Sequence, residues 1–188
     1  MNISRSVFAL LGAALAACAM PAAAQFYVGG AIGQANATEF CSDPALGGGV
    51  SGCDHKDVAL RGFVGYQLNS HLAFELGYHN FGKPTTVAPA AVRMSAWEGL
   101  LVGSVPIGGL SLLGKFGFYR GEGKGAGGGF TGIREQHTTY TFGAGLQYDL
   151  TKQFALRTEW MHYPNMLGGA FGGDTDVNTL NLGALYRF

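Results

Sequence analysis

Six charged side chains fall on the same face of an alternating, two-residue pattern, and they are the residues of this chain best placed to act together chemically. They are Arg61, Glu75, Glu98, Lys115, Arg157 and Glu159, with Arg187 further along that face. Three are cations and three are anions, a balance that a narrow interior of low dielectric requires, because an unpaired buried charge is strongly destabilising. Two roles stay open: an ion-paired plug that limits or gates small ions, or a polar core that only holds strands in register. We favour the second.

The histidines offer a weaker case for catalysis or metal binding. His55 lies in a long connection near Asp54 and Asp57, and the others are His71 in a short turn and His79, His137 and His162 towards the far strand ends. The spacing around His55 matches no established metal site. His162 has Trp160 and Pro164 beside it on its face, and no serine nearby. We therefore expect solvated loop and rim histidines, no enzymatic activity, no metal and no cofactor.

Two cysteines lie in the first long connection. Cys41 and Cys53 are separated by eleven residues that include four glycines and one proline. In an exported protein such a pair favours a disulfide, worth about 3 kcal/mol in the chain-entropy model. Two free thiols are the alternative. The residues between them contain no recognisable ligand motif.

A glycine-rich segment, GEGKGAGGGFTGIRE (121–135), superficially resembles a phosphate-binding loop. It lacks the Gly-Lys-Ser/Thr ending and the strand-to-helix context of a P-loop. We expect a surface loop.

Composition narrows the class of protein. The 188 residues carry 12 Lys+Arg and 12 Asp+Glu, only 13% are charged, 47% are hydrophobic and 32 are glycine. A typical globular domain has roughly 25% charged residues. Zero net charge argues against a nucleic-acid partner, and the hydrophobic content argues against disorder.

Residues 1–24 have the features of a secretory signal. Arg5 provides a positive start, residues 7–19 form an apolar run, and Ala22–Ala24 form a small-residue cleavage site, so we expect cleavage between Ala24 and Gln25. A lipidation signal ending at Cys18 is the alternative. No later segment reaches 18 consecutive apolar residues, so no transmembrane helix is expected.

From Gln25 onward the dominant period is two, which is typical of strands. Eight strands are predicted, at 25–35, 57–67, 71–81, 93–105, 110–120, 136–148, 153–163 and 177–188. Short turns at 68–71, 106–109 and 149–152 alternate with long connections at 36–56, 82–92, 121–135 and 164–176. This layout predicts an all-β, antiparallel, up-and-down barrel over residues 25–188.

The apolar face of each strand is expected to point outward, into lipid, because the opposite face is mostly glycine and small residues suited to a cramped interior. Outward-phase aromatics form two groups. One is Tyr66, Tyr148, Phe154, Tyr186 and Phe188 near the short turns, and the other is Tyr78, Trp97, Phe118, Tyr140 and Trp160 near the long connections. Two aromatic belts around an aliphatic band are the signature of a transmembrane β-barrel. A soluble antiparallel barrel is the alternative.

Three runs, GYQLNSHLAFELGYHNFG (65–82), GAGLQYDLTKQFALRTEW (143–160) and NLGALYRF (181–188), resemble the outer membrane protein A transmembrane-domain family. The resemblance implies an eight-stranded, monomeric barrel in the bacterial outer membrane, with its short turns in the periplasm. It also implies that Asn181, Gly183, Tyr186 and Phe188 form an assembly signal read by the barrel assembly machinery. Because the sequence ends at Phe188, we expect no separate peptidoglycan-binding domain.

The same resemblance bears on the charged residues and on function. Glu75 and Arg157 match positions where the family has ion pairs, whereas Gln147 stands where an acid is expected and Val102 where a base is expected. Glu98 and Lys115 could substitute through a different pairing. We expect a structural and surface role, with lipid and lipopolysaccharide around the barrel and adhesion or recognition through the long connections. A narrow pore or a channel for small apolar molecules is the alternative, and a lipid-A-modifying enzyme is a weaker one.

Overall fold

The structure, a computed structural model, describes residues 25–37, 56–82, 85–87, 90–126, 134–166 and 176–188. The strands are β1 (Gln25–Asn36), β2 (Lys56–Asn69), β3 (Leu72–Asn80), β4 (Thr85–Val87), β5 (Ala90–Ile107), β6 (Leu110–Ala126), β7 (Arg134–Asp149), β8 (Phe154–Tyr163) and β9 (Val177–Arg187). Among the described residues, no helix is long and apolar enough to cross a membrane.

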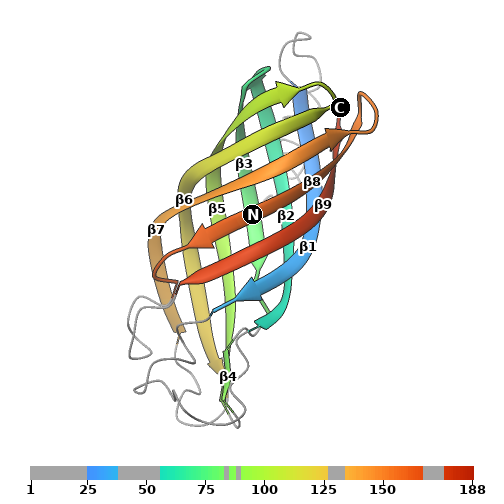
Figure 1. Ribbon diagram of the computed structural model, residues 1–188. Coiled ribbons are helices and arrows are strands. Elements are labelled where there is room, and N and C mark those ends of the chain that lie inside the picture. Colours follow the sequence, from blue (N-terminus) through green and yellow to red (C-terminus); the bar gives the residue numbers. More distant parts are fainter. Residues whose placement is uncertain (1–24, 38–55, 83–84, 88–89, 127–133, 167–175) are drawn as a thin grey trace, which may run out of the picture.

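The strands form one closed, antiparallel sheet (Figure 1). Strands that follow one another in the chain are paired, except β3 and β4; β1 pairs with β9, and β3 pairs with β5, which closes the ring. The small β4 pairs with β5 beyond the point where β3 ends. Eight strands therefore build the wall, and the prediction of an eight-stranded up-and-down barrel is confirmed.

The two ends of this barrel differ. At the turn end, neighbouring strands join through the tight turns after Asn69, Ile107 and Asp149. At the loop end, long segments separate β1 from β2 and β6 from β7. The terminus after β9 lies at the turn end (Figure 1).

Alternation along each strand sorts side chains between the lumen and the outer surface. In β3, Ala73, Glu75 and His79 are buried, while Phe74 and Leu76 are exposed. The same division holds in β8, where Arg157 and Glu159 face inward. The predicted outward apolar face is present because the pleat sends successive side chains to opposite sides.

Aromatic side chains pair across strands near both ends of the outer surface. Phe154 contacts Tyr186 at the turn end, with ring centroids 5.0 Å apart. Tyr78 contacts Trp97 at the loop end, also at 5.0 Å. The outer surface thus has an aliphatic band between two aromatic belts, as the sequence predicts.

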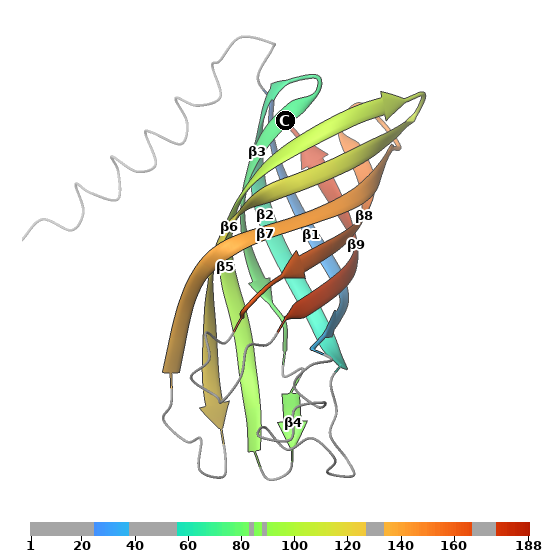
Figure 2. The same ribbon diagram turned by 60° about the vertical axis from the view of Figure 1, so that its left-hand side comes forward.

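Five strands, β1, β2, β5, β6 and β7, are longer than the sequence analysis expects, and two of its predicted connections are partly wrong. Connection 82–92 contains β4 and the start of β5, and connection 121–135 contains the end of β6 and the start of β7. Figure 2 shows β5, β6 and β7 continuing past the ends of β8 and β9. Glycines at 121, 123 and 125 hide the alternation of RGEGKGA, because every inward position lacks a side chain.

Gly65 shows why the lumen face needs glycine. A Cβ at this position would collide with the ring of Tyr27 on the neighbouring strand. Tyr27 is itself buried, and its hydroxyl reaches the middle of the lumen. A missing side chain on one strand therefore makes room for a large one on the next.

Candidate functional site in the barrel lumen

The structure brings all six predicted charges into one cluster, which we call the charge layer: Arg61, Glu75, Glu98, Lys115, Arg157 and Glu159. They come from β2, β3, β5, β6 and β8, and each is at most 5% exposed. Each of the six occupies an inward-facing position of its strand, and the register between the strands brings them to the same height in the lumen. The cluster therefore spans the lumen from wall to wall.

Glu75 is bound by all three cations of the charge layer. Its Oε2 accepts hydrogen bonds from Lys115 Nζ at 2.8 Å and Arg61 Nη2 at 3.1 Å. Its Oε1 accepts from Arg157 Nη1 at 2.5 Å and from the hydroxyl of Tyr27 at 2.8 Å. Four donors thus hold a fully buried carboxylate, the satisfaction that a buried charge requires.

Arg61 joins the remaining two carboxylates to this group. Its Nε lies 2.5 Å from Glu98 Oε1, and its Nη1 lies 2.9 Å from Glu159 Oε2. Glu159 also pairs with Lys115, and its Oε1 lies 3.3 Å from Arg157 Nη1. Because the charges form a connected network, no single pair can separate without disturbing the others.

Besides Tyr27, two further side chains contact the charge layer, and the sequence analysis missed all three. The hydroxyl of Tyr163 donates to Glu98 Oε2 at 2.7 Å. Phe63 lies beneath the cations, with the guanidinium carbons of Arg61 and Arg157 4.6 and 5.2 Å from its ring centroid. Strand alternation predicts that these side chains face inward. It does not predict which residue an inward-facing tyrosine or phenylalanine will contact.

On the loop-end side of the charge layer, the lumen is filled by rings and methionines. We call this group the aromatic layer; it comprises His79, Phe81, Met94, Tyr119, Met161, Tyr163 and Met166, all almost fully buried. Phe81 stacks on His79 at 4.3 Å, and Tyr163 meets Phe81 at 5.0 Å and Tyr119 at 5.2 Å between ring centroids. This packing leaves the loop-end half of the lumen occupied by side chains.

His79 corrects the expectation that the strand-end histidines are solvated. It is 0% exposed, and its Nδ1 lies 2.9 Å from the hydroxyl of Tyr163. His79 lies near the end of β3, but it occupies an inward position of that strand and Phe81 stacks on its ring. His137 and His162 are half-buried, His71 lies exposed in a turn, and His55 is outside the described residues.

Phe81 continues the inward alternation of β3 just beyond the end of that strand. β3 ends at Asn80, and Gly82 has a φ of 68°, a conformation that favours glycine. The backbone nevertheless stays paired with β5, because Phe81 N donates to Met94 O at 3.0 Å and Met94 N donates to Gly82 O at 3.1 Å. Because this pairing keeps the strand alternation, Phe81 lies on the same inward face as His79 and stacks on its ring.

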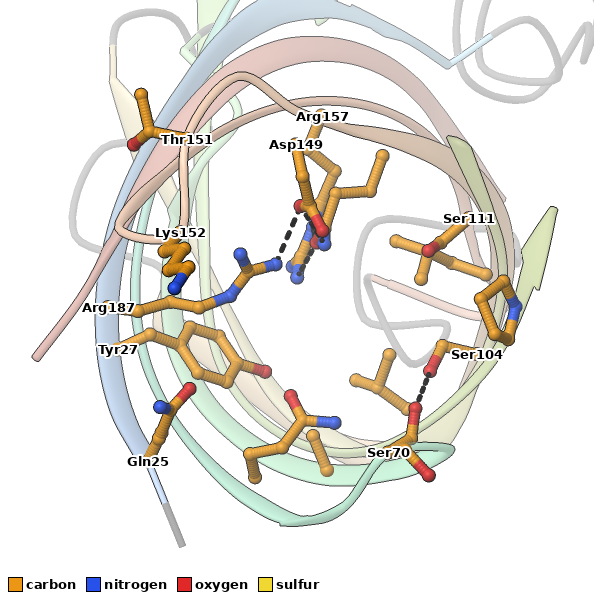
Figure 3. Close-up of a pocket in the computed structure, with 16 residues that line it drawn as sticks. Gln25, Tyr27, Ser70, Ser104, Ser111, Asp149, Thr151, Lys152, Arg157 and Arg187 are labelled. Carbon is orange, nitrogen blue, oxygen red and sulfur yellow. Dashed lines mark hydrogen bonds and ion pairs between the residues drawn. The ribbon is translucent and has the colours of Figure 1, made fainter. Parts of the chain in front are cut away.

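On the turn-end side, the lumen is open. A cavity of about 640 Å³ begins below Arg157 and Tyr27 and is lined by polar groups that include Gln67, Ser104 and Lys152 (Figure 3). At its mouth, Arg187 Nη2 and Asp149 Oδ1 lie 2.8 Å apart (Figure 3). The lumen is thus hollow and polar on one side of the charge layer and packed on the other.

Gln147 and Val102 take roles other than the acid and base expected there. Gln147 Oε1 accepts from Arg157 Nε at 3.1 Å and Nη2 at 2.8 Å, and its amide donates to Asp149. Val102 is buried and lines the cavity. Glu98 and Lys115 supply the acid and base, each paired with other members of the charge layer.

The remaining predicted residues divide between placed and undescribed ones. Asn181 and Gly183 face inward on β9, while Tyr186 and Phe188 face outward at the turn end, where Tyr186 lies 5.2 Å from Phe188 between ring centroids. Their reading as an assembly signal stays a prediction. Cys41, Cys53 and Ala24 lie outside the described residues, and Gln25 begins β1. Within the described ranges, no group of three or more His, Cys, Asp or Glu side chains could hold a metal ion.

A closed, antiparallel barrel with an apolar outer band, two aromatic belts and a cluster of buried charges in its lumen defines a transmembrane β-barrel of the outer-membrane type. A family model described as "Outer membrane protein beta-barrel domain" matches residues 7–188, and the chain belongs to this family. The resemblance to outer membrane protein A and the location in the bacterial outer membrane are thereby confirmed.

Individual relatives agree with this assignment. Outer membrane protein A of Serratia marcescens is 33% identical over 194 residues, which cover 96% of this chain, and the chain spans 54% of that relative's length. Neisserial surface protein A has a TM-score of 0.60 at 13% identity, covering 88% of this chain and 97% of its own. Ail of Yersinia pestis, solved with the heparin analogue sucrose octasulfate, has a TM-score of 0.56 at 17% identity, covering 90% and 100%. At these identities the solved structures support the fold alone.

Proposed function

We propose that this protein is a closed structural barrel that stabilises the outer membrane and presents its loop end to the outside. One observation carries the proposal: the charge layer and the aromatic layer together occupy the lumen on the loop-end side of the cavity. Outer-membrane barrels keep short turns in the periplasm and long loops outside, so the loop end is the surface available for adhesion or recognition. The barrel acts without catalysis and as a monomer, embedded among outer-membrane lipids and lipopolysaccharide.

Single-channel recording in planar bilayers tests the closed lumen. The wild-type barrel should give no sustained openings, because ions would have to cross a layer of mutually paired side chains. Glu75→Gln should raise the open probability, since it removes an anion that binds three cations. Glu122→Gln, which alters a carboxylate on the outer face of β6, is the matched control and should leave the traces unchanged. Steady wild-type conductance would contradict the proposal.

A narrow pore is the second candidate, favoured by the polar cavity at the turn end. That cavity already provides half of a water-filled path as far as Arg157. If the charge layer rearranged, the aromatic layer would be the remaining barrier. Recording from the double variant Glu75→Gln/Phe81→Ala separates the candidates, because the pore requires clearly larger currents than Glu75→Gln alone.

The absence of catalysis is tested separately. Reconstituted protein incubated with radiolabelled lipid A and phospholipid should give no change in the acylation of lipid A by thin-layer chromatography. The heat-modifiable gel shift confirms that the barrel is folded in the same sample. Any time-dependent transfer of label that the wild type performs would show the barrel to be an enzyme.

A further inference from the structure

The cavity on the turn-end side of the charge layer has the size and the lining of a ligand site. Its volume is about 640 Å³, within the range of about 300–1,000 Å³ that is typical of small-molecule sites. Polar side chains line it together with a few apolar ones, such as Val102 and Leu113. Because the short turns of outer-membrane barrels lie in the periplasm, this cavity faces the solutes of the periplasm.

The polar groups on the floor of the cavity are already bonded. Arg157 lies there, and its Nε and Nη2 both donate to Gln147 Oε1. Its Nη1 is paired with Glu75 and Glu159. The hydroxyl of Tyr27 likewise donates to Glu75. A ligand in the cavity must therefore take its polar contacts from the walls and the mouth.

Two cations at the mouth keep unused donors. Arg187 Nη2 donates to Asp149 Oδ1 at 2.8 Å, whereas its Nε and Nη1 have no partner among the described residues. Lys152 makes no hydrogen bond or ion pair with any residue that the structure describes. Both cations lie on the same side of the cavity (Figure 3), and Arg187 N donates to the carbonyl of Gln153, the residue after Lys152. With Asp149, the charged side chains at the mouth have a net charge of two minus one, or +1.

The guanidinium of Arg187 is held in place from behind. Asp149 Oδ1 accepts a hydrogen bond from Gln147 Nε2 at 3.0 Å as well as the one from Arg187. Gln147 is fixed in turn by its bonds to Arg157. Since the guanidinium is oriented before a ligand arrives, less conformational entropy is lost on binding.

The wall opposite these cations carries hydroxyl groups. Ser104 and Ser111 lie across the cavity from Arg187 and Lys152 (Figure 3). The hydroxyl of Ser111 makes no hydrogen bond within the described part of the chain. The hydroxyl of Ser104 donates to the carbonyl of Ser70 at 3.2 Å, which leaves its oxygen able to accept. One wall therefore suits an anion, and the other suits neutral groups that donate and accept hydrogen bonds.

We propose that this cavity binds a sugar acid, a small molecule with one carboxylate and several hydroxyl groups. The carboxylate lies against Arg187 and Lys152, and the hydroxyl groups face Ser104 and Ser111. A single carboxylate matches the net charge of +1 at the mouth, and its hydrogen bonds with cations are of the stronger, charge-assisted kind. The site lies outside the charge layer, so binding does not depend on whether the lumen is closed.

Titration of isotope-labelled protein in uncharged micelles, followed by NMR, tests the assignment. Glucuronate is the probe, glucose is its neutral counterpart, and acetate is an anion without hydroxyl groups. Glucuronate should shift the amide signals of residues around the cavity, such as Ser104, Asp149 and Arg187, in a saturable way. Glucose and acetate each lose one set of contacts, so both should bind about 10-fold more weakly.

Variants of the two walls separate the contacts. Arg187→Gln/Lys152→Gln should weaken glucuronate binding about 10- to 100-fold. Ser111→Ala should weaken glucuronate binding about 5-fold and leave acetate binding unchanged. Arg93→Gln/Lys124→Gln is the matched control, because it removes the same charge from exposed positions at the loop end and should bind glucuronate as the wild type does. A heat-modifiable gel shift shows that each variant is folded.

Three results would overturn the proposal. The first is a lack of glucuronate-dependent shifts around the cavity in the wild type. The second is equal binding of acetate and glucuronate, which would indicate a site for small anions in general. The third is equal weakening of glucuronate binding by the loop-end control, which would indicate attraction to the overall charge of the protein.

Discussion

The two halves of the lumen differ in how their space is occupied. On the loop-end side, rings and methionines fill the space, and Phe81, Tyr119 and Tyr163 meet edge-on. On the turn-end side, the wall encloses a polar cavity that is not filled by side chains. The charge layer lies at the boundary, with Tyr163 bonded to it from one side and Gln147 from the other. The charge layer therefore separates a half of the lumen that is packed with side chains from a half that is hollow.

We expect substitutions in the charge layer and the aromatic layer to lower the free energy of unfolding strongly, and substitutions in the wall of the cavity to lower it little. The largest effect should come from Glu75→Gln, because three cations would then share two carboxylates in a buried site. We expect a loss of about 3–5 kcal/mol in the free energy of unfolding. Urea titration in micelles, followed by the heat-modifiable gel shift, measures it.

Asp149→Asn is the control for that loss at the cavity mouth. Asp149 pairs with Arg187, but its side chain is 43% exposed. Its change should stay within about 1 kcal/mol. Similar losses for Glu75 and Asp149 would remove the distinction between the charge layer and the cavity.

The next prediction compares the loss of a packed side chain in the aromatic layer with the loss of one on the wall of the cavity. Phe81→Ala should cost about 3–5 kcal/mol, because it opens a cavity in the aromatic layer. Leu113→Ala, on the wall of the existing cavity, should cost about 2 kcal/mol, since water can fill the new space. The same urea titration measures both, and a Leu113 loss equal to that of Phe81 would mean that the turn-end half is packed as tightly.

Tyr163→Phe tests the contact between the charge layer and the aromatic layer. This variant keeps the ring but removes the hydroxyl that donates to Glu98 and lies 2.9 Å from His79. Leaving a buried carboxylate and imidazole short of a partner should cost about 1–3 kcal/mol. Tyr140→Phe, which removes a hydroxyl from the outer belt, is the control. Equal losses for the two would show that the hydroxyl of Tyr163 has no special role.

The smallest effect is expected at the mouth of the cavity. Arg187→Gln breaks one partly exposed ion pair, so the free energy of unfolding should change by about 0–1 kcal/mol. Added salt should leave the difference in unfolding free energy between Arg187→Gln and wild type unchanged within experimental error. A larger loss would make the mouth part of the stabilising core.

Much of this barrel follows from the two-residue period. Alternation predicts Phe74 outside and Glu75 inside, and the same alternation identifies the six members of the charge layer as inward-facing charges. The pattern did not predict the end of β6, because glycines occupy its inward positions and leave no alternation of side chains to recognise. Alternation does place His79 inward, but it does not specify that the rings of Phe81 and Tyr163 pack against it and bury it.

Pairing within the charge layer could not be predicted either. Strand phase shows that Glu98 and Lys115 point inward, but shear of the barrel decides which charges reach the same height. The structure joins Glu98 to Arg61 and Lys115 to Glu75. Only a defined register across β2, β3, β5 and β6 produces that choice.

The positions of the two tryptophans determine what light can report about this molecule. Trp97 and Trp160 both lie in the loop-end belt on the outer surface, 68% and 42% exposed in the protein itself. Their emission is therefore a sensor of the surrounding lipid at one depth of the membrane. Brominated lipids should quench it strongly, whereas repacking inside the lumen should leave the spectrum nearly unchanged. Fluorescence will follow insertion of the wall, and a separate probe inside the barrel is needed to follow its closure.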